Sequence, residues 1–404
     1  MYLQILERFD ATFAWIRNIF LTPIKNSKSD TTPNQKNSLP CDHDRNRENY
    51  SLIAVIGSGS YAKVYHAIKN EKEECALKIV ELNNLLSTWK CCYREAVILN
   101  HIKKHTNNSK ESGICAFNCG WLDEETNMIY LDMPRYELDL RKFIINSFGG
   151  IPEEHVKYMA YMFLKGLCAL HEAGIVHRDL KPSNALLNAT TGEISISDFN
   201  LSSSLEQPMC KGFLSQEVCS IYYKAPEILS NDERTRENNS NNTMKYEYGL
   251  SIDIWAAACV IFEMAMGPNP LFAASSKAEL MQFIAKDFGI DIKKYSHEDL
   301  VQISLGISTD QKNFFYDNFN LKQRLKCNRF LKSNKKEEGF EDFIVFMLNF
   351  NSKNRPSARA CLKHPWILKT YAEPPQNMLP QLKISSYSSI EEYKRELGVF
   401  LYRA

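Results

Sequence analysis

The sequence has no marked excess of either charge, no C-x-x-C cysteine pair and no long hydrophobic segment. Its 49 basic and 48 acidic residues give a net charge of +1, so no overall field would attract nucleic acid. The twelve cysteines include no C-x-x-C pair, which argues against a zinc site and favours reduced thiols. No run approaches the roughly 18 apolar residues that cross a bilayer, and the first residues show no secretory signal. We therefore expect a cytoplasmic or nuclear protein with no transmembrane segment and no nucleic-acid partner.

The two ends of the chain differ in pattern from its centre. Residues 1–21 carry an apolar stripe at helical spacing, which predicts an amphipathic helix, and residues 22–49 are typical of a flexible polar linker. The helix could dock on the folded body or lie on a membrane surface; its few cations favour docking. Residues 369–404 form a C-terminal extension that ends in a predicted helix, for which Ser388 and Glu391 would form a capping box.

Between these ends the periodicity changes from strands to helices. Apolar and β-branched runs at 52–56, 64–68 and 76–80 predict an antiparallel sheet, followed by a helix over 88–103 and a strand over 129–133. Helical periods dominate beyond residue 138, most clearly over 153–173, where Pro152 suits the first turn and Gly174 ends the helix. The sequence therefore predicts an α+β fold with two lobes. Insertions are expected near 230–247, which is polar, and over 290–340, which is charged and irregular.

A glycine-rich segment lies between the first two predicted strands. Gly57-Ser58-Gly59-Ser60-Tyr61-Ala62-Lys63-Val64 lets backbone amides approach phosphate oxygens that a Cβ would push away. The same residues are also common in a simple hairpin turn, and the strand that follows excludes a Rossmann fingerprint. Lys78 on the third strand and Glu95 on the next helix are, taken alone, ordinary solvated charges. Each feature is therefore ambiguous by itself.

A denser group of polar residues follows the long helix. It comprises His177-Arg178-Asp179-Leu180-Lys181-Pro182-Ser183-Asn184, then Asp198-Phe199-Asn200, then Ala225-Pro226-Glu227. Carboxylates, a lysine and an amide at these spacings can bring a metal ion, a phosphate and a hydroxyl nucleophile to one point. The ordered set is far more specific than any of its members.

With these motifs in this order, residues 50–368 resemble a eukaryotic protein kinase. The resemblance implies an N-lobe over 50–132, a hinge over 133–137 and a C-lobe over 138–368. It further implies transfer of the γ-phosphoryl of Mg-ATP to hydroxyls of protein substrates, with ATP and Mg²⁺ bound between the lobes. Residues that would line the nucleotide pocket are Ile56, Gly57, Gly59, Val64, Ala76, Lys78, Met133 as gatekeeper, Tyr136 and Leu186.

The resemblance also implies a role for each polar motif residue. Asp179 would orient the acceptor hydroxyl and accept its proton, and Lys181 would support the γ-phosphate. Lys78 would hold the α- and β-phosphates while paired with Glu95. The expected metal ligands are Asn184 and Asp198, and the expected structural residues are His177 beneath the catalytic loop, Asp253 holding its backbone, and Glu227 paired with Arg355.

Within the kinases, the stretch 217–227 is similar to the cyclin-dependent and mitogen-activated branch, and Lys181 is typical of serine/threonine kinases. Ser215 lies where cyclin-dependent kinases carry an activating threonine. A phosphate there would add about −1.5 to −2 charges that Arg94 and Arg178 could bind, and would raise activity. Ser203 stands where the branch has a third phosphate-binding arginine, so Ser215 is equally interpretable as a solvated loop serine.

Several departures from the family keep a second interpretation open. Asn200 replaces the glycine after Asp-Phe, Ala62 replaces the third loop glycine, and Lys224 replaces an arginine, which weakens proline-directed specificity. The chain could therefore be a pseudokinase scaffold that binds partners without turnover, through the N-terminal helix and the long insertions. Separately, a regulatory partner could bind the helix of Glu95 or the N-terminal helix. The start of the Glu95 helix is unlike a cyclin-contacting sequence. A small-molecule kinase is disfavoured, because the segment ending in Ala225-Pro226-Glu227 is typical of a peptide platform.

Overall fold

The structure is a computed structural model that describes most of residues 50–402. Within this span it does not describe 60–61, 84, 106–111, 116, 148–149, 189–191, 206–217, 232–247, 296, 307–318, 327–338, 369–370 and 372–380. The predicted N-terminal helix, the linker, Ser215 and most of the 230–247 insertion therefore lie outside the described residues. No helix among the described residues is long and apolar enough to cross a membrane.

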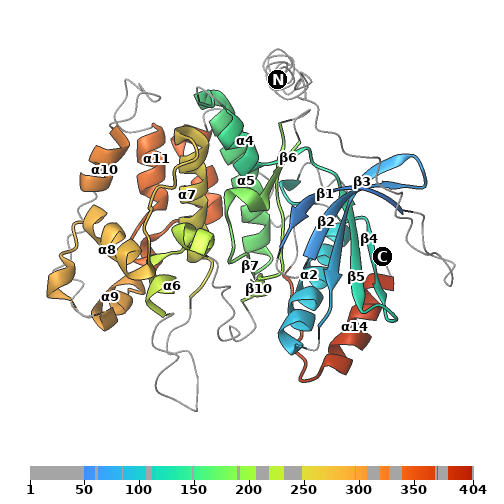
Figure 1. The fold of residues 1–404 in the computed structure, drawn as a ribbon. Helices are drawn as coiled ribbons and strands as arrows, with labels where there is room; N and C mark the ends of the chain where they lie inside the picture. Colours follow the sequence, from blue (N-terminus) through green and yellow to red (C-terminus); the bar gives the residue numbers. More distant parts are fainter. Residues whose placement is uncertain are drawn as a thin grey trace.

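The N-lobe is a five-stranded antiparallel sheet with one long helix (Figure 1). Its strands are β1 (Tyr50–Ser58), β2 (Ala62–Lys69), β3 (Glu73–Glu81), β4 (Cys119–Asp123) and β5 (Met128–Pro134), in the order β1-β2-β3-β5-β4. Helix α2 (Leu86–His105) packs on it through residues such as Ile98 and Leu99, which share one hydrophobic cluster with Val80 and Leu131. Lys103, Lys104 and His105 in its last turn complement the helix dipole.

The C-lobe is mostly helical (Figure 1). Its elements begin with β6 (Leu138–Asp139), α4 (Leu140–Asn146), α5 (Glu153–Glu172), β7 (Ile175–Val176), β8 (Ala185–Leu187), β9 (Ile194–Ile196), β10 (Ser203–Ser204), α6 (Pro226–Asn231) and α7 (Ser251–Met266). They continue with α8 (Lys277–Asp287), α9 (His297–Ser304), α10 (Phe319–Lys326), α11 (Phe340–Met347), α12 (Ala358–Leu362) and α13 (Pro365–Leu368). Two small sheets, β6-β8-β9 and β7-β10, flank the catalytic loop. The predicted α+β fold with two lobes is confirmed.

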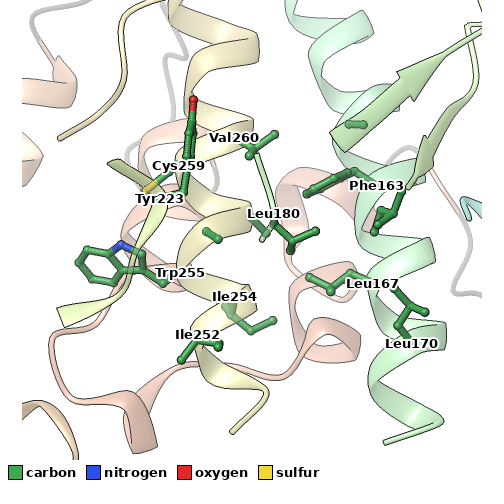
Figure 2. Packing of buried hydrophobic residues seen from close by; sticks show 14 of the residues in the cluster. Phe163, Leu167, Leu170, Leu180, Tyr223, Ile252, Ile254, Trp255, Cys259 and Val260 are labelled. Carbon is green, nitrogen blue, oxygen red and sulfur yellow. The ribbon is translucent and has the colours of Figure 1, made fainter. Parts of the chain in front are cut away.

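The centre of the C-lobe is the contact between α5 and α7. Figure 2 shows Phe163 and Leu167 of α5 facing Val260 and Ile254 of α7, with Leu180 of the catalytic loop between them. All of these side chains are almost fully buried. Helix α5 ends at Glu172, and Gly174 two residues later has a φ of +74°, a left-handed conformation that glycine adopts without strain. The core of the lobe thus holds the catalytic loop directly.

One prediction for the C-lobe was wrong, and one strand of the N-lobe was missed. The stretch 290–340 is not irregular throughout, because it contains α9 and α10, whose Leu300, Ile303, Leu321 and Leu325 are buried in the core. The charged residues between these positions had hidden the helical period. The strand β4 was not predicted, because Cys119-Gly120-Trp121-Leu122-Asp123 has no β-branched residue.

The C-terminal helix α14 (Ile390–Tyr402) has its capping box one residue later in the chain than the sequence predicts. The Glu392 amide donates to Ser389 Oγ over 3.2 Å, and the Glu392 carboxylate accepts from the amides of Ser388 and Ser389. The box is therefore Ser389 with Glu392 rather than Ser388 with Glu391. Consecutive serines and glutamates fit both registers, and the burial of Tyr393 and Leu397 selects the observed one.

The close approach of Gly113 and Gly166 gives a test of this packing. A Cβ at Gly166 in α5 would overlap the carbonyl oxygen of Gly113, whereas a Cβ at Gly249 would meet nothing within 4 Å. We expect Gly166→Ala to destabilise the protein by at least about 2 kcal/mol, although alanine favours a helix by ~1 kcal/mol. Gly249→Ala should change the free energy of unfolding little. Urea unfolding of both variants measures the difference, and equal stabilities would contradict the packing described.

Candidate active site

A buried lysine joins three separate elements of the fold. Lys78 Nζ in β3 donates to Glu95 of α2 over 2.6 and 2.9 Å, and to Asp198 Oδ1 over 3.1 Å. Lys78 and Glu95 are only 8% and 3% exposed. Burial alone would lower the pKa of Lys78, but the carboxylates of Asp198 and Glu95 raise it above its ordinary value. The lysine is therefore a fixed positive charge at the junction of the lobes.

The catalytic loop brings its polar side chains to one carboxylate. Lys181 Nζ lies 2.8 Å from Asp179 Oδ2, and Asn184 Nδ2 donates to the carbonyl oxygen and to Oδ2 of Asp179 over 2.8 and 3.1 Å. A short 3-10 helix over Pro182–Asn184 sets this spacing. The three predicted residues therefore form one hydrogen-bonded group, with Asp179 at its centre and partly exposed.

Two buried side chains, Asp253 and His177, hold the backbone around the catalytic loop. Asp253 of α7 accepts from the backbone amides of His177 and Arg178 over 2.7 and 2.9 Å, and from His171 Nε2 over 3.1 Å. His177 Nδ1 accepts from the Asp179 amide, so its Nε2 carries the proton and donates to the Ser197 carbonyl over 3.0 Å. Arg178 has a φ of +73°, and the Asp253 contact supports this sparsely populated conformation.

The residues expected to hold magnesium fit a hard cation. Burial would raise the pKa of Asp198, but Lys78 and its hydrogen bond keep that pKa below its ordinary value, so the group is a carboxylate. Among the described residues the Asn184 side chain makes its hydrogen bonds through Nδ2, which leaves the amide oxygen as an acceptor. Ser197 joins the two segments, because its amide and hydroxyl both donate to the Asn184 carbonyl. Carboxylate and amide oxygens are the ligand type that Mg²⁺ prefers.

The fold of the glycine-rich segment does not by itself require glycine at positions 57 and 59. A Cβ at Gly57 would lie 3.6 Å from the Val64 side chain, and a Cβ at Gly59 would lie 3.8 Å from the Ala62 carbonyl. Both distances are ordinary contacts, and neither glycine has a positive φ. The chain itself therefore does not require glycine here, which favours close approach by a ligand over a simple hairpin turn.

The remaining pocket positions lie on adjoining strands. Ala76 pairs with Met133 across β3 and β5, and Lys78 pairs with Leu131, so these positions face the same side of the sheet. Leu186 in β8 pairs with Ser195, whose Oγ accepts from the Tyr136 hydroxyl over 3.0 Å. Ile56 in β1 is 37% exposed. The hinge prediction began too early, because Met133 and Pro134 still belong to strand β5.

Asn200 stands in a backbone conformation that any residue adopts. Positive φ values occur at Asp198 (+66°) and Arg178 but not at Asn200, so the replacement of glycine creates no strain. Its Oδ1 is buried and has no hydrogen-bond partner among the described residues. The preceding Phe199 is fully buried, and its ring centre lies 5.5 Å from that of His177.

The two arginines expected to bind a regulatory phosphate differ in burial, since Arg94 of α2 is buried and Arg178 is partly exposed. Burial raises the pKa of the Cys91 thiol, and the charges of Arg94 and Arg178 partly oppose this. Arg178 Nη2 donates to the hydroxyl of Tyr248 over 2.6 Å, with the guanidinium 5.6 Å from the ring centre. Sequence reasoning missed Tyr248, which follows a polar stretch with no local signal. Ser203, where a third arginine was expected, is a buried residue of β10.

An ion pair and a carboxylic acid brace the segment after the catalytic loop. Arg355 donates to both carboxylate oxygens of Glu227 over 2.7 and 2.8 Å, and both side chains are fully buried. Glu263 of α7 accepts from Arg141 over 3.1 Å and has no exposed surface. Burial raises the pKa of Glu263 to about 7. Tyr223 and Arg141 lower this pKa only in part; Figure 2 shows Tyr223 beside α7.

Glu263 therefore predicts a pH dependence of stability. Its pKa is about 7 in the folded protein and 4.5 ordinarily, so the folded state binds the proton more tightly. This stabilisation is largest below pH 4.5 and is lost as the pH rises to 7. The free energy of unfolding of Glu263→Gln, measured relative to that of the wild type, should increase by roughly 2–3 kcal/mol from pH 5 to pH 8. Urea unfolding at both pH values, with the exposed Glu124→Gln as control, would contradict this if the two variants behaved alike.

Comparison with known proteins places this site in a family. The family described as "Protein kinase domain" matches residues 50–367. The chain is 28% identical over 338 residues to mitogen-activated protein kinase KSS1 of Saccharomyces cerevisiae, over 80% of this chain and 83% of that protein. It is 27% identical over 369 residues to extracellular signal-regulated kinase 1 of Candida albicans, over 87% and 82% of the two chains. It is also 27% identical over 374 residues to mitogen-activated protein kinase spk1 of Schizosaccharomyces pombe, over 87% and 89%. The chain therefore belongs to the protein kinase family, in the branch of the mitogen-activated and cyclin-dependent kinases.

Proposed function

We propose that this protein transfers the γ-phosphoryl group of Mg-ATP to serine or threonine hydroxyls of other proteins. The observation that carries the proposal is the contact of Lys78 with both Glu95 and Asp198, next to the group of Asp179, Lys181 and Asn184. Lys181 and the branch favour serine and threonine over tyrosine. The named relatives are signalling kinases, so a role in signalling in the cytoplasm or nucleus, on protein substrates, is part of the proposal.

The chemistry follows from fixed charges. The acceptor oxygen attacks the γ-phosphorus, the bond from the γ-phosphorus to the bridging oxygen breaks, and the hydroxyl proton passes to the Asp179 carboxylate. Lys78, held in place by Glu95, would bind phosphate oxygens and offset their charge. Lys181, 2.8 Å from Asp179, would do so at the γ-phosphate. Asn184 and Asp198 would hold magnesium, which supplies further neutralisation of the phosphates when bound.

The direct test is phosphorylation of a peptide library with Mg-ATP. We expect transfer to serine and threonine peptides, and a loss of roughly 10²–10⁴-fold in kcat in Asp179→Asn, because the hydroxyl is no longer oriented and deprotonated. The control is Asp291→Asn, an exposed change outside the site. A scaffold without turnover predicts no transfer by the wild type above the level of Asp179→Asn.

Restoring the family's glycine at position 200 gives a second test of the scaffold alternative. Because the Asn200 backbone lies in an ordinary region, we expect Asn200→Gly to keep kcat and the KM for ATP within about threefold of the wild type. Steady-state kinetics with the best peptide measures both. A gain above tenfold on introducing glycine would mean that Asn200 suppresses the reaction.

A further inference from the structure

The hydrophobic cluster on one face of the N-lobe sheet contains no helix residue from the described part of the chain. Cross-strand partners share a face, so Lys78 lies on the same side as Leu131, which belongs to the cluster with α2. Leu77, the residue before Lys78, lies on the opposite side, which we call the outer face. The cluster on the outer face consists of strand residues alone: Tyr50, Leu52, Ala67, Cys75, Leu77, Ile79, Trp121, Met128 and Tyr130.

Strand β1 exposes large apolar side chains beside this cluster. Val55 pairs with Tyr65, which pairs with Leu77, so Val55 lies on the outer face. Val55 is 55% exposed, and Ile53, at an irregularity of the strand, is 54% exposed. Exposed apolar side chains that continue a hydrophobic cluster are typical of a surface that binds another segment or partner.

The N-terminal part of the chain joins the sheet at this same face. Tyr50, the first described residue, donates from its hydroxyl to Asp132 Oδ2 over 3.0 Å, and its ring stacks on Trp121 at 5.4 Å. Asp132 has no exposed surface and also accepts from Lys69 over 3.3 Å. Tyr50 is therefore fixed, and residues 1–49 connect to the fold at the edge of the outer face.

The predicted N-terminal helix fits the outer face in size. Its apolar stripe consists of Leu6, Phe9, Phe13, Ile16 and Phe20. From the first to the last of these a helix rises about 21 Å, and five strands about 4.8 Å apart span about 19 Å. As a random coil, the predicted linker over 22–49 would reach about 30 Å, which is enough for any point of the face. Such a tether favours even a weak contact, because the effective concentration is of the order of millimolar.

The charges of the same segment favour a protein surface over a lipid surface. Residues 2–21 hold two basic side chains, Arg8 and Arg17, and two acidic ones, Glu7 and Asp10. Helices that lie on anionic membranes carry an excess of cations on their polar face, which this segment lacks. The apolar stripe is therefore better matched to the outer face of its own chain.

We propose that residues 2–21 bind to the outer face as an amphipathic helix and hold the hairpin of β1 and β2 over the nucleotide. Val55 directly precedes Ile56, and Tyr65 directly follows Val64; Ile56 and Val64 are expected to line the nucleotide pocket. A helix packed on the outer side of this hairpin limits the movement of the glycine-rich segment. The effect on the nucleotide rests on the proposed kinase activity, whereas the docking itself does not.

Hydrogen exchange of the full-length protein tests the docking. Phe13→Asp places a carboxylate in the apolar stripe, and the control Asn18→Asp places the same group on the opposite side of the helix. We expect Phe13→Asp to raise exchange in residues 50–58 and 62–69, and Asn18→Asp to leave it at the wild-type level. Wild-type exchange of these strands in Phe13→Asp would overturn the proposal.

The same variants reveal whether the helix binds elsewhere. Sedimentation with vesicles of phosphatidylserine and phosphatidylcholine measures lipid binding, and light scattering of the protein alone measures dimerisation. We expect a monomer that stays in the supernatant. Vesicle binding or a dimer that Phe13→Asp abolishes would mean that the helix occupies a lipid surface or a second copy, and would overturn the proposal.

Steady-state kinetics tests the effect on the nucleotide. Val55→Asp changes an exposed residue of the outer face, and the control Ser51→Asp places the same group at an exposed position of β1. We expect Val55→Asp and Phe13→Asp each to raise the KM for ATP at least about threefold, because the hairpin is no longer held in place. Ser51→Asp should keep the wild-type KM.

The double variant shows whether the two residues act through one contact. Val55→Asp with Phe13→Asp should raise the KM for ATP no further than either change alone. Multiplication of the two effects would mean that they act separately, and would overturn the proposed role of the helix. If the wild type shows no turnover, the kinase proposal fails, and the exchange experiment still decides the docking.

Discussion

The contact of Lys78 with Glu95 and Asp198 is the constraint on which the rest of the structure depends. Its three members come from β3, from α2 and from the segment after β9, so it forms only when both lobes and the helix are in place. Removing one partner of such a buried pair typically costs about 3–5 kcal/mol, because the remaining charge is left without compensation. The contacts of Lys78 thus form only when the whole site has one geometry, and the same lysine is the proposed ligand for phosphate.

The supports of this contact lie far from it in the sequence. Asp253 in the core helix α7 holds the backbone before Asp179, and the pair of Glu227 with Arg355 fixes the segment that follows. On another face of α2, Tyr93 contacts Tyr387 and Tyr393 of the C-terminal extension. Asp253, Glu227 and Arg355 are buried, and both carboxylates are hydrogen-bonded, which suits a site that must keep one arrangement. The core therefore determines the position of the catalytic residues, and not the loops alone.

The polar residues of the site and two of its supports, Asp253 and the pair of Glu227 with Arg355, could be predicted from the sequence, whereas the contacts of Tyr248 and of the C-terminal helix could not. Lys78, Glu95, Asp179, Asn184 and Asp198 were found because motif spacing within short segments reflects the geometry of a loop or a strand end. The capping box was placed one residue early, since neighbouring serines and glutamates fit two registers and only the burial of Tyr393 selects one. Tyr248 and the contact of Tyr93 with Tyr393 gave no signal, because contacts between residues distant in the chain leave no local period. The roles of Ser215 and of the N-terminal helix stay predictions, as both lie outside the described residues.

The central claim is that the charge of Lys78, held by Glu95, neutralises the phosphates during transfer. The most direct measurement is single-turnover transfer from ATP to a serine peptide by the wild type, by Lys78→Met and by Lys72→Met, an exposed lysine in the turn before β3. The account predicts a loss of at least about a hundredfold for Lys78→Met and a rate within twofold of the wild type for Lys72→Met. Retention of the wild-type rate by Lys78→Met would contradict it.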